Sequence, residues 1–285
     1  MLRILSTYLF VNRKLTPDLL GQIARSGVGA VELFCAWHHF DYRSADSARE
    51  LAGALRDSNL TLHAVHAPVE RDSGPTRQSG VPLSVSDPER GRRLDAVDEI
   101  RRALDMAEYV PFRYLVLHLG SSRDLADARL FDAAFNSLEH LHVFAKQSGV
   151  TIAIENTPGE LATPANLRQF IAETRLTDLR LCFDIGHAHL GDGVLPSFEI
   201  MRELVVTAHV HDNHGFKDEH LLPYDGAIEW KAALPVLAAR QLPLVFELKE
   251  QSAYAEPAPA TVALEAARTA FDRVEAELDS SKHTE

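Results

Sequence analysis

Cysteine is nearly absent from this chain, which has only Cys35 and Cys182 among 285 residues. Two cysteines cannot build the disulfide framework of a small secreted domain, and their scarcity suits a reducing compartment. We therefore expect a cytoplasmic protein whose fold depends on the burial of apolar side chains. At 46% hydrophobic residues, the composition is ordinary for a globular protein of this kind.

Positive charge is also in short supply. The chain carries 29 lysines and arginines against 41 aspartates and glutamates, a formal net charge of −12 with histidine neutral. Non-specific nucleic-acid binding needs a basic face that neutralises phosphates. Nucleic acid is therefore an unexpected partner for this protein.

Long hydrophobic runs are missing as well. No apolar run approaches the roughly 18 to 20 residues that a membrane helix requires. The apolar start at residues 1–14 soon meets polar residues and no small-residue cleavage site follows, so we expect a first strand and no signal peptide. A glycine-rich phosphate loop near the start is absent too, which argues against a doubly wound dinucleotide-binding sheet.

Short β-branched or apolar runs alternate with longer segments of helical period. The predicted strands are Arg3–Tyr8, Ala30–Phe34, Thr61–His66, Tyr114–His118, Thr151–Glu155, Arg180–Asp184, Val205–His211 and Leu244–Glu247. The predicted helices are Leu51–Asn59, Arg93–Glu108, Leu130–Gln147, Asn166–Thr174, Lys231–Ala239 and Ala263–Leu278. Eight strands alternating with helices indicate an α/β protein with a (β/α)₈ TIM barrel.

No change of composition divides the chain, so we predict one domain over residues 1–279 and a frayed tail over 280–285. Two segments hold too many turn-forming residues for a helix and are predicted as loops, 67–88 after the third strand and 213–226 after the seventh.

Histidine is plentiful, with 14 residues, and several follow the predicted strands directly. Histidine or a carboxylate ends each of strands three to eight, at His66, His118, Glu155, Asp184, His209 with His211, and Glu247. His187, Asp218 and His220 follow within the next loops. The carboxyl ends of barrel strands form one rim around a single mouth.

So many imidazoles and carboxylates at one rim would be costly to bury unpaired, and a divalent cation removes that cost. Nitrogen and oxygen ligands without thiolate fit Zn²⁺, Mn²⁺, Fe²⁺ or Co²⁺ and argue against a structural zinc knot. Each residue alone has an ordinary alternative, for example Glu155 as a salt-bridge partner or Asp184 as a helix N-cap. Their occurrence at six successive strand ends favours a metal centre.

The segments around these residues resemble the xylose isomerase-like TIM-barrel superfamily, which joins endonuclease IV with sugar isomerases and epimerases. The matching segments are VHAP (65–68), LHLGS (117–121), IENT (154–157), FDIGH (183–187), HVHD (209–212), DEH (218–220) and FEL (246–248). The resemblance extends from the second strand to the eighth.

The resemblance implies two alternative metal sites, holding between one and three ions. In the endonuclease IV pattern nine ligands hold three metals, and here they would be His66, His118, Glu155, Asp184, His187, His209, Asp218, His220 and Glu247. In the epimerase pattern one metal needs only Glu155, Asp184, the seventh-strand histidine and Glu247.

The seventh-strand ligand is ambiguous, because His209 and His211 point to the same face of the strand. The HxxD spacing to Asp212 favours His209, and His211 would then support the ligands or contact substrate.

Other residues near the rim have less certain roles. Glu32 ends the second strand and is either an ion-pair partner inside the barrel or part of the site. Trp37 and His38 follow it and could cover a sugar face or simply pack on the barrel. Asn156 and Lys249 flank two of the proposed ligands and could bind substrate oxygens, although Lys249 could equally be a solvated surface charge.

We weigh three functions. The first is an isomerase or epimerase of a small sugar, sugar phosphate or polyol, in which Glu155 and Glu247 move a proton and His187 stabilises a metal-held enediolate. The second is a phosphodiesterase acting on abasic DNA, favoured by the complete nine-residue set and opposed by the charge of −12. The third is a barrel that binds metal and ligand without turnover. The sequence leaves open whether the chain forms a homo-oligomer.

Overall fold

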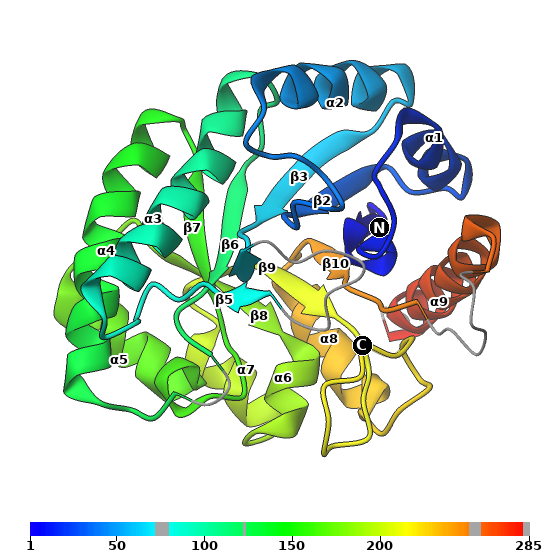
Figure 1. Cartoon of the computed structure of the whole chain (residues 1–285). Coiled ribbons are helices and arrows are strands. Elements are labelled where there is room, and N and C mark those ends of the chain that lie inside the picture. Colours follow the sequence, from blue (N-terminus) through cyan, green and yellow to red (C-terminus); the bar gives the residue numbers. More distant parts are fainter. Residues whose placement is uncertain (72–79, 122–123, 251–257, 282–285) are drawn as a thin grey trace.

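Eight parallel strands close into a barrel in the computed structural model, which describes residues 1–71, 80–121, 124–250 and 258–281 (Figure 1). Around the barrel the order is β1, β10, β9, β8, β7, β6, β3, β2. The strands are β1 (Ile4–Ser6), β2 (Ala30–Phe34), β3 (Thr61–His66), β6 (Tyr114–His118), β7 (Thr151–Glu155), β8 (Arg180–Asp184), β9 (Val205–Val210) and β10 (Leu244–Phe246). The predicted (β/α)₈ barrel is confirmed.

Five of the predicted strands, β2, β3, β6, β7 and β8, have the expected bounds at both ends. β1 is shorter than predicted, because the Ser6 hydroxyl accepts from the backbone N–H of Tyr8 and a 3₁₀ helix, η1 (Thr7–Phe10), begins there. β9 and β10 each end one residue early. His211 and Glu247 therefore lie just beyond the last ladder residue, still on the barrel rim.

Helices surround the strands on the outside of the barrel (Figure 1). They are α1 (Pro17–Arg25), α2 (Ala45–Asp57), α3 (Arg90–Asp105), α4 (Ala128–Gln147), α5 (Pro164–Thr174), α6 (Ile185–Leu190), α7 (Val194–Met201), α8 (Trp230–Ala239) and α9 (Ala260–Ser281), with short 3₁₀ helices η2 (Met106–Glu108) and η3 (Glu160–Ala162). Each of the six predicted helical segments overlaps one of these helices.

The sequence prediction missed α1, α6 and α7. α1 has a clear local signal, since the Thr16 hydroxyl caps it and Pro17 occupies its first position. α6 and α7 span only six and eight residues, too few to show a helical period.

The predicted loop at 67–88 contains a small antiparallel pair, β4 (Glu70–Arg71) and β5 (Val81–Pro82), while residues 72–79 lie outside the described part of the chain. α9 continues to Ser281, two residues into the segment 280–285 that is predicted as a tail. Residues 282–285 are not described. Within the described ranges, no helix is both long and apolar enough to cross a membrane.

The main hydrophobic core lies between the strands and the surrounding helices, and a smaller cluster fills the barrel interior. The members of the inner cluster are Ala64, Tyr114, Val116, Ala153 and Cys182. On the outside, Phe246 of β10 stacks on Phe271 of α9, with ring centroids 3.9 Å apart. This stack attaches the last helix to a strand whose end carries Glu247.

Phe246→Ala should destabilise the fold by about 3–5 kcal/mol, because it leaves a cavity beneath α9 at a fully buried position. Val262→Ala is the control. Val262 lies on α9 and is 58% exposed, so its truncation should change the free energy of unfolding by less than about 0.5 kcal/mol. Urea denaturation followed by circular dichroism measures both. Equal losses in the two variants would contradict the assigned packing.

Candidate metal centre

The carboxyl ends of β3 and β6 to β10 bring all nine predicted ligands to one mouth. His66, His118, Glu155 and Asp184 are the last residues of their strands, and His209 is the penultimate residue of β9. The other four predicted ligands lie in α6, in the loop after β9 and directly after β10. Seven of the nine are almost completely buried, and only His118 and Asp218 are half-buried.

The ligand atoms form four groups whose members lie within 4.8 Å of one another; one of them, Glu155 with Cys182 and His209, includes a thiol, and the other three hold only imidazoles and carboxylates. Of these three, the first group is His66, His118 and Glu155, the second is Glu155, Asp184, His209 and Glu247, and the third is His187, His211, Asp218 and His220. Glu155 belongs to both the first and the second group, because its carboxylate has two oxygens. These buried clusters are candidate sites for a divalent metal.

His209 gives the clearest test of whether a cation fits. Its Nε2 lies 3.1 Å from Oε2 of Glu32, so this nitrogen carries the proton and donates to the carboxylate. Its Nδ1 lies 3.0, 3.4 and 3.7 Å from oxygens of Glu247, Glu155 and Asp184, yet makes no hydrogen bond. In the neutral ring this nitrogen presents a lone pair to three carboxylates, and a cation among them removes the repulsion.

Three further histidines have the same arrangement. In His66, His187 and His220 the Nδ1–H donates to a main-chain carbonyl, which fixes the tautomer of the neutral ring and makes Nε2 its acceptor. That Nε2 faces Glu155 at 3.2 Å in His66, and faces Asp218 at 3.2 Å in His187 and 3.1 Å in His220. The accepting carbonyls belong to Ala67, Asn156 and Glu247, at 2.9, 2.9 and 2.8 Å. The donor set therefore fits metal ligation.

Asp184 combines two roles that the sequence left as alternatives. Its Oδ1 accepts from the backbone N–H of His187 at 2.6 Å and so caps α6, while both of its oxygens lie 3.1 Å from Nε2 of His211. Asn156 bonds to the backbone of Asp184 in both directions, at 2.8 and 2.9 Å, and holds the ends of β7 and β8 together. A Cβ at Gly186 would overlap the ring of His211, so this turn requires glycine.

Asp212 organises the loop that carries Asp218 and His220. Its buried carboxylate accepts from the backbone N–H of Tyr224 at 2.9 Å and from the indole N–H of Trp230 at 2.7 Å. It also accepts from the backbone N–H groups of Asn213 and Ile228. His220 itself adopts a left-handed backbone conformation with φ 49°, a strained position that the anchored loop maintains.

In the metal-free chain the buried carboxylates and imidazoles shift one another's pKa values. Burial alone would raise the pKa of Glu247, but the charge of the neighbouring His209 outweighs it and lowers the pKa to about 2. In the same way, burial opposes but the carboxylate of Glu155 raises the pKa of His66 to about 8. The pKa values of Glu155, Asp184 and Asp218 lie below their usual range, and those of His187, His209 and His220 lie above theirs.

The other predicted contacts lie at the rim. Trp37 is 49% exposed, Lys249 is exposed and His38 is half-buried. Sequence reasoning missed Tyr8, whose ring centroid lies 4.9 Å from that of His220. Burial and the charges of Glu247 and Asp218 raise the pKa of this phenol above its usual range. Its only sequence signal was its place at the end of the first strand.

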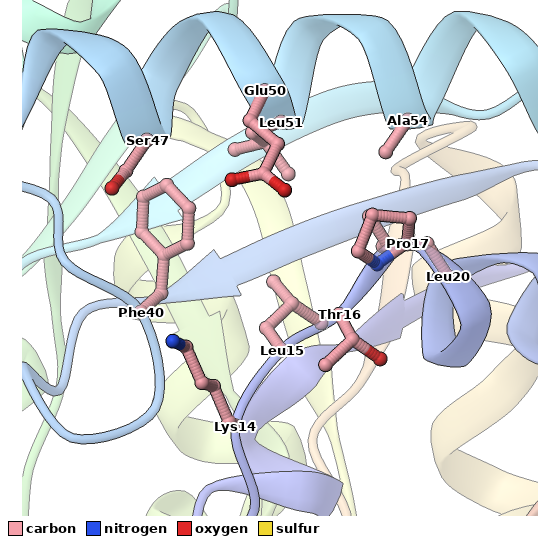
Figure 2. A pocket seen from close by; sticks show the side chains of 10 residues that line it. All are labelled: Lys14, Leu15, Thr16, Pro17, Leu20, Phe40, Ser47, Glu50, Leu51 and Ala54. Carbon is pink, nitrogen blue, oxygen red and sulfur yellow. The ribbon is translucent and has the colours of Figure 1, made fainter.

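A separate groove lies outside the barrel, between α1 and α2 (Figure 2). Its volume is about 170 Å³, and its walls include Leu15, Leu20 and Phe40 with the carboxylate of Glu50. It shares no residue with the three metal clusters. It therefore does not belong to the candidate centre.

Comparisons with known proteins agree with this architecture. A family model described as xylose isomerase-like TIM barrel matches residues 20–270. An uncharacterized protein of Methanocaldococcus jannaschii is 29% identical over 242 residues, which cover 81% of this chain and 78% of that protein. Among solved structures, a D-tagatose 3-epimerase-like protein is similar with a TM-score of 0.80, 22% identity and coverage of 100% of this chain and 99% of that chain. D-psicose 3-epimerase from Clostridium cellulolyticum, solved with D-tagatose, has a TM-score of 0.74 at 13% identity, covering 98% and 99% of the two chains.

Glu32→Gln should weaken metal binding about tenfold or more, because the amide no longer orients His209 or increases its basicity as a carboxylate does. Competition with a fluorescent chelator measures the change. Glu99→Gln is the matched control, since Glu99 is also buried but bonds to Tyr42 and Arg43, away from the clusters. Equal metal affinity in both variants would contradict the role of Glu32.

Metal should stabilise the protein more at pH 9 than at pH 6.5. A histidine with a raised folded-state pKa stabilises the metal-free fold below its unfolded pKa of about 6.5. That contribution disappears as pH rises through the folded value, about 8 for His66. Metal displaces the same protons, so the gain in Tm on adding Zn²⁺ to chelator-treated protein should grow over this range. A gain that is constant with pH would count against ligation by these imidazoles.

Proposed function

The chain belongs to the xylose isomerase-like TIM-barrel family, and on that premise we propose that it is a metal-dependent isomerase or epimerase of a sugar, sugar phosphate or related polyol. The observation that carries the proposal is the position of His209 Nδ1, which makes no hydrogen bond and lies among the carboxylates of Glu155, Asp184 and Glu247. The fold is shared with a sugar epimerase whose solved structure includes a ketose, which supports the substrate class.

Glu155, Asp184, His209 and Glu247 would hold the principal ion. Their nitrogen and oxygen donors suit Zn²⁺, Mn²⁺, Fe²⁺ or Co²⁺. When bound, such an ion supplies Lewis acidity to a substrate carbonyl and its neighbouring hydroxyl.

Glu155 and Glu247 would transfer the proton. They project from β7 and from the end of β10, and β8 and β9 lie between those two strands. Their lowered pKa values keep both carboxylates unprotonated at neutral pH, so either can accept the proton from the carbon beside the carbonyl. The electron pair moves onto the carbonyl oxygen to give an enediolate, and the first carboxyl now carries the proton. The opposite carboxylate takes a proton from solvent and delivers it to carbon, while the first carboxyl releases its proton to solvent. His187 would stabilise the developing negative charge on oxygen.

Burial excludes bulk water from the deepest groups at the mouth. Glu155, Asp184 and His209 are fully buried. Trp37 and His38 at the rim would cover the sugar face, and Lys249 would contact its oxygens. His211 and Asn156 would position Asp184 and also lie close enough to the clusters to contact bound substrate.

A phosphodiesterase acting on abasic DNA is the second candidate, because the three clusters use all nine positions of the endonuclease IV pattern. Charge opposes it. Among the described rim arginines, Arg43 lies 2.9 Å from Glu99 and Arg71 lies 2.9 Å from Asp95, so both are already neutralised. Arg77, on the same loop as Arg71, lies outside the described residues. A barrel that binds metal and ligand without turnover is the third candidate, since ligation and catalysis use the same groups.

Incubation with a ketose or inosose in D₂O should exchange one carbon-bound hydrogen, and Glu155→Gln or Glu247→Gln should slow the exchange at least about hundredfold. An amide cannot accept the proton at neutral pH. NMR of the recovered sugar measures exchange, and metal content is determined in parallel because both residues are proposed ligands. Glu99→Gln is the control and should exchange at the normal rate.

The same preparation should not cut duplex DNA containing an abasic site at physiological salt, because the net charge opposes binding. Efficient nicking, with no exchange across a broad panel of sugars, would replace the isomerase proposal with the phosphodiesterase. Nicking confined to very low salt would not, since that regime exaggerates weak electrostatic contacts.

A further inference from the structure

A polar pocket that is open to the surface lies at the opposite end of the barrel from the metal clusters. Its volume is about 360 Å³, and it lies between the amino ends of β6, β7, β8 and β9 and the carboxyl end of α4. We call it the floor cavity. Its charged or titratable lining residues are Arg113, His142, Lys146, Asp178 and Arg180.

The floor cavity is positive in a strongly acidic protein. Three permanent cations and one titratable imidazole face a single carboxylate, Asp178. Both Lys146 Nζ, at 3.1 Å, and His142 Nε2, at 3.6 Å, approach the same oxygen of that carboxylate. One negative charge therefore serves the lysine and the histidine, and neither arginine has a carboxylate of the described residues within ion-pair distance.

The two arginines differ in how firmly they are held, since Arg180 is half-buried and hydrogen-bonded while Arg113 is exposed. Nη1 of Arg180 donates to the carbonyls of Thr177 and Leu179, at 2.8 Å each. Its Nε and Nη2 have no hydrogen-bond acceptor in the part of the chain that the structure describes. Arg113 lies over the ring of Tyr114, 5.1 Å from its centroid. Neither the carbonyls nor the ring neutralises the charge, and Asp178 acts on Arg180 only from beyond ion-pair distance. One fixed guanidinium and one exposed guanidinium therefore line the same cavity.

We propose that the floor cavity binds the phosphate group of a small anion, either inorganic phosphate or a phosphate monoester. Guanidinium groups pair with phosphate oxygens through two parallel N–H donors, and Arg180, which is already fixed by two carbonyls, loses little conformational freedom on binding. Lys146 adds a further cation at the edge. The volume admits one small anion, and the net charge of −12 disfavours a polyanionic chain such as nucleic acid.

This site is distinct from the proposed catalytic mouth, because the same strands carry the two sites at their opposite ends. β6 begins with Tyr114 in the floor cavity wall and ends with His118 in the first metal cluster. β8 likewise begins with Arg180 and ends with Asp184. Phosphate binding at the floor therefore does not depend on metal or on the proposed reaction.

Equilibrium dialysis of radiolabelled inorganic phosphate against the metal-replete protein at physiological salt tests the site. Arg113→Gln and Arg180→Gln should each weaken binding about tenfold. Asp178→Asn should tighten binding, because it removes the cavity's only carboxylate and releases Lys146. Arg129→Gln, an exposed arginine paired with Asp127, is the control for loss of one unit of charge and should leave binding unchanged.

The location is tested by anomalous scattering from crystals soaked in tungstate, a phosphate analogue. The expected peak lies between Arg113 and Arg180. A peak only at the metal clusters, or phosphate affinity that is unchanged in both arginine variants, would overturn the proposal. Comparison of inorganic phosphate, ribose 5-phosphate and ribose identifies the source of the phosphate group. Tighter binding of the ester than of inorganic phosphate indicates a metabolite, and equal binding indicates free phosphate. If ribose binds as tightly as ribose 5-phosphate, the proposal is also overturned.

Discussion

The mutual neutralisation of buried imidazoles and carboxylates at the barrel mouth is the interaction on which the rest of the site depends. Moving an ion from water to a protein interior costs several kcal/mol even after relaxation, so Glu155, Asp184 and His209 persist together only because each offsets the others. Removing one partner of such a set leaves an uncompensated charge. The balance also explains why the carboxyl pKa values fall and the imidazole pKa values rise in the same small volume.

One ring nitrogen of each of four site histidines donates a hydrogen bond to a fixed acceptor, and this determines what the other nitrogen can do. A backbone carbonyl holds Nδ1–H of His66, His187 and His220, and Glu32 holds Nε2–H of His209. In the neutral ring the opposite nitrogen can then only accept, and it faces carboxylates. The hydrogen bonds of the strand ends and loops therefore impose an arrangement that neutral imidazoles cannot satisfy. In the metal-free chain protons on the rings satisfy it, and a bound metal cation would take their place. Asp212 extends the same control to the loop that carries Asp218, through bonds to backbone and indole donors.

Much of this arrangement could be predicted from the sequence, because a barrel strand has a simple signature and its carboxyl end has a fixed place. The bounds of β3, β6, β7 and β8 follow from the apolar runs, and His66, His118, Glu155 and Asp184 come last in them. The sequence alone therefore predicts that these four side chains meet at the mouth of the barrel. Other features depend on contacts between distant segments and leave no local signal. Tyr8 reaches His220 only because β1 and β10 are neighbours, and the floor cavity joins α4 to the starts of four strands.

The central claim, that a divalent metal lies among Glu155, Asp184, His209 and Glu247, is tested most directly by anomalous scattering from crystals of metal-replete protein. Data collected on both sides of the zinc, iron, cobalt and manganese absorption edges identify the element as well as its position. The expected result is an anomalous peak within metal-ligand distance of Nδ1 of His209 and of oxygens of the three carboxylates. An absence of anomalous signal at the mouth, with Nδ1 of His209 hydrogen-bonded directly to a carboxylate, would contradict it.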